Sequence, residues 1–412
     1  DFILTGNSGS SGDTITGSDG DDTIDFLGTI NGFYTLNYSF GVGPISVTLL
    51  ADSGTIDKGT GAVNGTDTLL NIDMISGIEG GLLIRGSNEN DTFNVDTTGV
   101  ENLFIRGGAD GGSDTITRTG TGNLRVDLRD YEGVTVDAGA GTATERFAAG
   151  GPTAQATLGV TGFVDEWRGS FFDDIFVGSA SNDRFITESG NDTVDGAAGF
   201  NTVRYNRPGV SSLSVVYTSP ASAMVAGLCG TAAFTDTLTN IQQVIGSDIG
   251  VDSFIGSTGD QSFSGRGGAG YFDGGAGDDT LDASDGRDLF TFGSSSGQDT
   301  ITGFEEGFDL LDLSAYNLTG SAQFVSYTFD GQDTLIDLGS GNTITVEGTN
   351  LTNNADSDAY IFSDIDGDGL DNTLNGTAAN ERFNAGGGDD TINAGGGDDL
   401  LFSGGATLDF NG

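Results

Sequence analysis

The chain has 412 residues and a formal charge of −47, because 61 acidic residues face only 14 basic ones. A chain this acidic repels a polyanion, so nucleic acid is excluded as a partner. No His, one Lys (Lys58) and one Cys (Cys229) are present, which removes Ser-His-Asp triads, His-ligated zinc and intrachain disulfides and argues against a P-loop. The charge needs a compensating cation, and a divalent metal is the obvious one.

No apolar run approaches the roughly 18 residues of a membrane helix, so the chain is not expected to span a membrane. The first residues also lack the basic and apolar pattern of a cleaved signal peptide. We therefore expect any export to use a route that leaves no N-terminal signal behind.

A nine-residue repeat begins near the start of the chain. SGSSGDTIT and GSDGDDTID place Asp13 and Asp22 nine residues apart, and an apolar residue follows each acid two places later. GSNENDTF and GGSDTI are weaker copies, around Asp91 and Asp114.

More regular copies occupy the middle and the end of the chain. Between Gly169 and Val203 the acid recurs at Asp174, Asp183 and Asp192. From residue 252 to 290 the polar position runs through Asp252, Gln261, Gly270, Asp279 and Asp288. Near the end it runs through Asn372, Glu381, Asp390 and Asp399.

A fixed short period predicts a solenoid, in which each unit buries its apolar face only by stacking on its neighbours. Two nine-residue units make a coil of eighteen, so Asp174 would lie over Asp192, and Asp183 over Asn201, at a strand spacing of about 4.8 Å. Carboxylates that close repel one another and chelate a cation when one is present. The alternative is that each Gly-Asp turn merely carries a solvated acid, but turn chemistry does not demand a stride of nine. The fold class predicted is all-β, a calcium-binding parallel β-roll (a β-helix solenoid) interrupted by irregular β segments.

The strand-rich stretches between the runs predict five segments. A degenerate β unit with a short N-terminal roll would cover 1–95, and a second unit ending in the roll 169–203 would cover 96–205. A third unit with the roll 246–292 would cover 206–292. A β segment over 293–363 and a C-terminal roll over 364–412 would follow.

The best copies, GGAGDDTLD (274–282), AGGGDDTIN (385–393) and AGGGDDLLF (394–402), resemble the repeats-in-toxin (RTX) nonapeptide G-G-x-G-x-D-x-U-x. In that family, turn carbonyls and the sixth-position Asp bind calcium. The resemblance implies multiple calcium ions, with these candidate ligands: Asp13, Asp22, Asp91, Asp114, Asp174, Asp183, Asp192, Asp252, Asp279, Asp288, Asp390 and Asp399. Gln261, Gly270 and Glu381 depart from the motif, so the sites that they would share are expected to be incomplete.

DIDGDGLDN (364–372) is a separate candidate. Asp364, Asp366 and Asp368 alternate as in an EF-hand-like loop, where every second carboxylate faces the ion. Asn375 stands where such a loop carries its bidentate Glu. The two interpretations are a calcium loop and an ordinary acidic turn.

Residues 283–318 resemble the C-terminal part of RTX proteins exported by type I secretion, matching at Asp288, Asp299, Phe304, Asp309 and Leu313. This implies one-step export to the cell exterior.

The function predicted is a secreted, calcium-dependent structural protein of the bacterial cell surface or extracellular matrix, such as a surface-layer or fibre subunit, and not an enzyme. Its expected partners are calcium ions and further copies of itself, with a cell-surface polysaccharide as a further candidate. The alternative is the non-catalytic RTX region of a larger secreted protease, lipase or polysaccharide epimerase, or of an adhesin.

Overall fold

The computed structural model describes residues 2–3, 13–26, 33–39, 43–60, 64–75, 81–108, 112–146, 155–316, 318, 323–353, 360–361, 363–367, 370, 372–377, 380–396, 399–402 and 407–410. These residues form strands and turns, with short 3-10 helices at Ile72–Met74, Ser314–Tyr316 and Leu351–Asn353. Within these ranges, no helix has the length and apolar character needed to cross a bilayer. The chain divides into two compact units, Asp1–Arg204 with Phe234–Ile241, and Tyr205–Ala233 with Gln242–Gly412.

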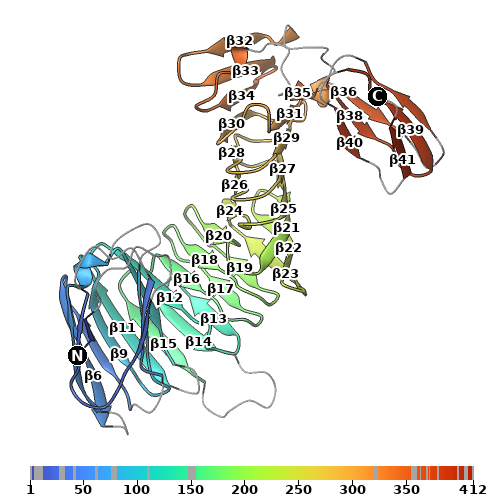
Figure 1. Cartoon of the computed structure of the whole chain (residues 1–412). Coiled ribbons are helices and arrows are strands. Elements are labelled where there is room, and N and C mark those ends of the chain that lie inside the picture. Colours follow the sequence, from blue (N-terminus) through green and yellow to red (C-terminus); the bar gives the residue numbers. More distant parts are fainter. Residues whose placement is uncertain are drawn as a thin grey trace. The chain divides into compact units, whose positions relative to one another are not determined.

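The first unit stacks short strands into two sheets (Figure 1). One sheet contains β1 (Phe2–Ile3), β3 (Thr23–Asp25), β5 (Ser46–Leu49), β6 (Ser53–Thr60), β7 (Asn64–Leu70), β9 (Thr92–Asp96), β11 (Ser113–Thr119), β13 (Val134–Asp137), β14 (Thr142–Glu145), β15 (Thr157–Thr161), β17 (Ile175–Val177), β19 (Thr193–Asp195) and β23 (Ala232–Thr239). The other contains β2 (Thr14–Thr16), β4 (Phe33–Asn37), β8 (Gly81–Arg85), β10 (Asn102–Arg106), β12 (Asn123–Asp127), β16 (Glu166–Arg168), β18 (Arg184–Ile186) and β20 (Thr202–Arg204).

The second unit repeats this arrangement. One strand set is β21 (Val210–Ser219), β22 (Ser222–Cys229), β25 (Val251–Ser257), β27 (Gly270–Gly275), β29 (Leu289–Thr291), β31 (Leu310–Asp312) and β35 (Tyr360–Ile361). The other is β24 (Gln243–Ile245), β26 (Ser262–Ser264), β28 (Thr280–Asp282), β30 (Gln298–Thr302), β32 (Ser326–Phe329), β33 (Thr334–Gly339) and β34 (Asn342–Val346). Two three-stranded sheets end the chain, β36 (Ser363–Asp366), β38 (Glu381–Asn384) and β40 (Leu400–Phe402), then β37 (Thr373–Asn375), β39 (Asp389–Asn393) and β41 (Thr407–Phe410).

Strand register confirms the eighteen-residue coil. Phe176 of β17 pairs in parallel with Val194 of β19, eighteen residues later. Phe254, Phe272 and Phe290 pair in succession along β25, β27 and β29 at the same interval. The predicted parallel β-roll is therefore correct.

The apolar positions of the repeat make the core. Phe254, Phe272 and Phe290 are fully buried. Their rings stack with centroids 5.1 and 4.9 Å apart, so each coil packs directly on the next. In these three coils, one stacked phenylalanine per coil buries apolar surface between neighbouring coils.

The segments between repeat runs belong to the same ladders. Ile24 of β3 pairs in parallel with Leu69 of β7, 45 residues later, because an antiparallel β5–β6–β7 hairpin pair is inserted in that coil. The inserted β13–β14–β15 strands lengthen the coil from Ile116 to Val160 in the same way. The irregular segments are thus long coils of the roll, which the nine-residue stride could not show.

We expect Phe272→Ala to lower the free energy of unfolding of the second unit by about 3–5 kcal/mol, because it removes the middle ring of a closed stack. Denaturant unfolding in saturating calcium measures this change. Phe308→Ala is the control, since that ring is 57% exposed, and should change the value by less than about 0.5 kcal/mol. Equal effects of the two substitutions would contradict the stacked core.

Candidate metal centre

The sixth-position acids of the repeats lie at the start of a strand or immediately before it, and their side chains are buried in the roll. All but Asp183 accept a hydrogen bond from the backbone N–H of the equivalent residue one coil earlier, whereas at Asp183 the N–H itself donates to Asn201 Oδ1. Asp174 N–H donates to Asp192 Oδ1 at 2.7 Å, and Gln261 N–H donates to Asp279 Oδ1 at 2.7 Å. We call this set the inner ladder: Asp91, Asp114, Asp174, Asp183, Asp192, Asp252, Asp279, Asp288, Asp299, Asp309 and Asp390.

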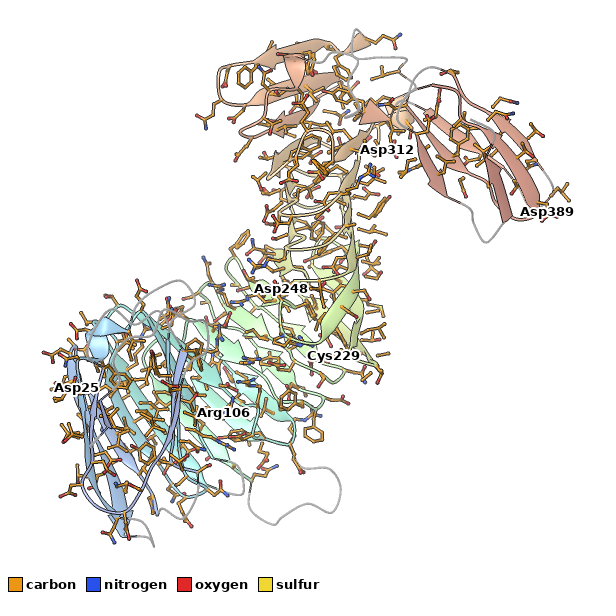
Figure 2. All side chains as sticks on the ribbon, viewed as in Figure 1. Asp25, Arg106, Cys229, Asp248, Asp312 and Asp389 are labelled. Carbon is orange, nitrogen blue, oxygen red and sulfur yellow. The ribbon has the colours of Figure 1, made fainter. Side chains whose placement is uncertain are left out.

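The inner ladder is buried, unlike other acids of the chain. Asp174 and Asp279 are 1% exposed and Asp288 is 2% exposed. By contrast, Asp248 and Asp389, which Figure 2 labels, are exposed. A buried carboxylate is strongly destabilising unless donors or a cation compensate its charge.

Some members of the ladder are compensated by serine. Both the N–H and the Oγ–H of Ser170 donate to Asp174, at 2.8 and 2.7 Å. Val134 N–H supplies a third bond to that carboxylate at 2.8 Å. Serines also donate through N–H and hydroxyl to Asp91, Asp183 and Asp252.

Other members keep one oxygen open. The Oδ1 atoms of Asp279, Asp288 and Asp390 accept a backbone N–H, whereas their buried Oδ2 atoms have no hydrogen-bond partner. The buried Oδ2 atoms of Asp114, Asp192 and Asp299 are also without a hydrogen bond of good geometry, although the Tyr131 hydroxyl faces that of Asp114. A buried, unpartnered carboxylate oxygen is what a hard cation such as calcium requires.

Burial shifts the protonation of these acids. Desolvation raises the pKa of Asp279 and Asp288 to about 7, and the neighbouring carboxylates Asp299 and Asp309 add to the shift. Desolvation also raises the pKa of Asp174, to about 7, although the Ser170 hydrogen bonds oppose it. Without a cation, protonation is the remaining way to relieve the buried charge.

The positions match oxygen coordination by calcium. Asp279 N–H bonds Asp299 Oδ1 at 3.1 Å and Asp288 N–H bonds Asp309 Oδ1 at 2.8 Å, so acids of successive coils lie together in pairs. Within the described ranges, no three His, Cys, Asp or Glu side chains converge on one point. An ion held by Asp279 and Asp299, or by Asp288 and Asp309, would therefore take turn carbonyls as further ligands.

The remaining predicted ligands are placed less uniformly. Asp399 is half-buried and accepts Glu381 N–H at 2.9 Å, Asp22 is half-buried, and Asp13 is exposed. Asp366 is exposed in strand β36, whose register with β38 replaces the loop predicted there. For Asp364 only the backbone in β36 is described, and Asp368 lies outside the described residues.

The positions that depart from the motif keep the ladder continuous. Ser257 N–H donates to Gln261 Oε1 at 2.9 Å, and Thr377 N–H donates to Glu381 Oε1 at 3.2 Å. Gly270 offers only its N–H, which reaches Asp288 Oδ1 at 2.5 Å. An incomplete metal motif therefore does not interrupt the stacking.

Two features were missed by sequence reasoning. Asp299 and Asp309 belong to the inner ladder, although the sequence suggested only a secretion-like segment there; the DTI and DLL triplets were the available signal. An outer ladder runs through the residue before each acid: Asp173 Oδ1 accepts Asn191 N–H at 2.8 Å, and Asp260 Oδ1 accepts Asp278 N–H at 3.0 Å. The recurring Asp or Asn at position five was its signal.

Comparison with known proteins agrees with this geometry. The profile of the RTX calcium-binding nonapeptide repeat matches residues 5–27, 168–203, 248–281, 255–290, 264–301 and 366–406. The chain carries RTX calcium-binding repeats. These matches cover every run in which the structure shows eighteen-residue coils.

Other comparisons add little. A search of curated proteins finds no match. Among solved structures, the chain is similar to the extracellular lipase LipA from Serratia marcescens, with 16% identity and a TM-score of 0.20. That similarity covers 50% of this chain, and this chain spans only 41% of the lipase.

Gly274, which opens the turn 274–282, leaves room for the carboxylate of Asp279. A Cβ on Gly274 would lie 2.4 Å from Asp279 Oδ2. We therefore expect Gly274→Ala to displace that oxygen and weaken calcium binding about tenfold, a typical loss when a metal ligand is misoriented. Calorimetric titration measures it. Gly293→Ala is the control because its Cβ would meet nothing within 4 Å, and a similar loss there would contradict this role for Gly274.

Acid should substitute for calcium in the RTX roll. The pKa of Asp279 and Asp288 is raised in the folded state, so the neutral carboxyl stabilises the fold at low pH, and this contribution is lost as pH rises through about 7. In chelator, the urea midpoint of the second unit should therefore fall between pH 5 and pH 8. Saturating calcium should remove this fall, because the ion replaces the proton. A midpoint in chelator that rises over the same interval would contradict the assignment.

Proposed function

We propose that this chain is a secreted, calcium-dependent structural protein of the bacterial cell surface or extracellular matrix, such as a surface-layer or fibre subunit. The observation that carries the proposal is the set of buried, unpartnered Oδ2 atoms on Asp279, Asp288 and Asp390. These oxygens make the folded state depend on a cation. The coils that carry these oxygens stay unfolded where free calcium is low and fold where calcium is millimolar.

The total charge supports the same conclusion. A net charge of −47 opposes compaction, and bound divalent ions reduce it where the acids are packed closest. RTX repeats are typical of proteins exported in one step by type I secretion, a route that suits a chain unable to fold before export. We therefore place the folded protein outside the cell.

Assembly is supported by sheet edges. The sheet β36–β38–β40 and the sheet β37–β39–β41 each have three strands, so β40 and β41 lie at edges within the described part of the chain. Edge strands present N–H and C=O groups to which another copy can add. Head-to-tail addition of identical units is an open, heterologous contact, which yields filaments or sheets.

A non-catalytic role is part of this proposal. It is supported by a sequence without His and by acids that lie in pairs along the ladder, where they suit metal binding. The alternative is an RTX region belonging to a larger secreted enzyme or an adhesin, which would fold with calcium without forming a lattice.

Electron microscopy of the purified chain tests the proposal. In millimolar calcium we expect regular sheets or filaments, and excess chelator should dissolve them and lower the β signal in circular dichroism. Magnesium at the same concentration is the control, since its smaller, octahedral shell suits these carbonyl-rich turns poorly. A folded chain that stays monomeric in calcium would contradict the structural role and favour the alternative.

A further inference from the structure

We propose that the RTX sites are of two kinds: those at Asp22, Asp174 and Asp183 in the first unit carry their own compensating groups and form without calcium, whereas those at Asp279, Asp288 and Asp390 in the second unit require it. The inference builds on the proposed calcium-coupled folding and confines it to part of the chain. The repeat profile itself matches both kinds alike.

The first run holds a built-in cation. Lys58, the only lysine, is fully buried. Its Nζ donates to Ser18 O at 2.7 Å, to Gly20 O at 2.6 Å and to Asp67 Oδ1 at 2.5 Å, and lies 3.9 Å from Asp22 Oδ2.

This ammonium stands where an RTX turn would place its metal. Ser18 and Gly20 are the second and fourth residues of the turn GSDGDDTID, and Asp22 is its sixth. Asp67 is the acid one long coil later, because its Oδ1 accepts Asp22 N–H at 3.1 Å. Two turn carbonyls and two acids of adjacent coils form an oxygen set suited to calcium, but here a covalently attached charge lies among them.

The acid pair around Lys58 is fully engaged. Asp67 Oδ2 accepts the Tyr38 hydroxyl at 2.7 Å, and Asp22 Oδ2 accepts the Ser18 hydroxyl at 2.7 Å. A calcium ion could enter only by expelling the ammonium, which is tethered through β6 and would be left buried without its partners.

Asp174 and Asp183 in the run 168–203 use serine instead, whereas the buried Oδ2 atom of Asp192 in the same run accepts no hydrogen bond. The oxygens of Asp174 receive three donors, and Asp183 receives the N–H and hydroxyl of Ser179. Asp183 also lies against Asn201, a neutral residue, since Asp183 N–H donates to Asn201 Oδ1 at 3.0 Å. That coil pair therefore carries one charge where a calcium pair would carry two.

In the second unit, no serine among the described residues donates a hydrogen bond to the buried Oδ2 atoms of Asp279, Asp288 and Asp390. Gly275 and Gly386 occupy the serine position before Asp279 and Asp390. Ser284 occupies it before Asp288, but its hydroxyl donates to Asp282 instead, at 3.1 Å. Each of these acids keeps a buried Oδ2 without a hydrogen bond.

Basic residues are also scarce in the second unit. The first unit contains 10 of the 14 basic residues against 31 acids, and the second contains 4 against 30. Of those four, Arg266 pairs with Asp248, Arg382 pairs with Asp312, and Arg287 donates to Phe308 O. The charge of the second unit's ladder is thus left for a diffusible cation.

Hydrogen exchange of the full chain, resolved by segment, tests the proposal. In chelator we expect residues 14–25, 64–70 and 169–186 to keep their protection, while residues 270–302 and 372–402 lose it at least tenfold and regain it in calcium. Equal loss in both groups would overturn the partition. If calcium changes the protection of no segment, the proposed calcium-dependent function fails instead.

Two matched substitutions sharpen the test. Asp279→Asn should lower the calcium stoichiometry by about one ion, whereas Asp183→Asn, which is equally buried on the same ladder, should leave it unchanged. A lower stoichiometry in Asp183→Asn would overturn the proposal.

The lysine itself provides the reciprocal experiment. Lys58→Met should make the protection of residues 14–25 and 64–70 depend on calcium, because the acid pair loses its cation. Arg266→Met is the control, since it also removes a positive charge but from an exposed ion pair. If Lys58→Met keeps full protection in chelator, Lys58 is not the stand-in cation. If Lys58→Met folds neither in chelator nor in calcium, two other measurements still test the proposal. These are the hydrogen exchange of the unsubstituted chain and the calcium stoichiometries of Asp279→Asn and Asp183→Asn.

Discussion

The structure depends on one repeated interaction, the hydrogen bond from a backbone N–H to the buried carboxylate of the next coil. At Asp174 and Asp192, and again at Asp279 and Asp299, it ties the turn of one coil to the turn of its neighbour. A charged acceptor makes this bond stronger than an amide pair. It also brings negative charges together inside a thin roll, where each must be compensated.

Three kinds of compensation occur along the ladder. Lys58 brings a covalent ammonium, Ser170 brings an N–H and a hydroxyl, and Asp279 keeps an oxygen open for a metal. The first two act as soon as the chain folds, whereas the third acts only when calcium is present. Under the proposed function, the third kind couples folding to calcium outside the cell, and the other two kinds limit this coupling to part of the chain.

Much of this could be predicted from the sequence, and the limits have physical causes. A stride of nine with an acid and an apolar residue two places apart is visible in the letters, so Phe176 and Phe185 were predictable core residues. The long coils were not, because inserted hairpins such as β5–β6–β7 hide a register of 45 residues. Asp366 lies in strand β36 and not in the predicted loop. Alternating acids are compatible with a strand that exposes one face as well as with a calcium loop, so the pattern alone does not distinguish the two.

By itself the sequence determined the roll, because a period of nine can bury its apolar residues only by stacking coils, and it determined that oxygen-rich turns would carry the charge. Only the tertiary structure decided which turns are open to a metal. Asp174 and Asp279 occupy the same motif position, yet donors from Ser170 and Val134 surround the first and none reaches Oδ2 of the second. Ser170 is a neighbour of Asp174 in sequence, but Val134 is 40 residues away and Lys58 is distant from Asp22, so the effect of these two donors exists only after the coils have stacked.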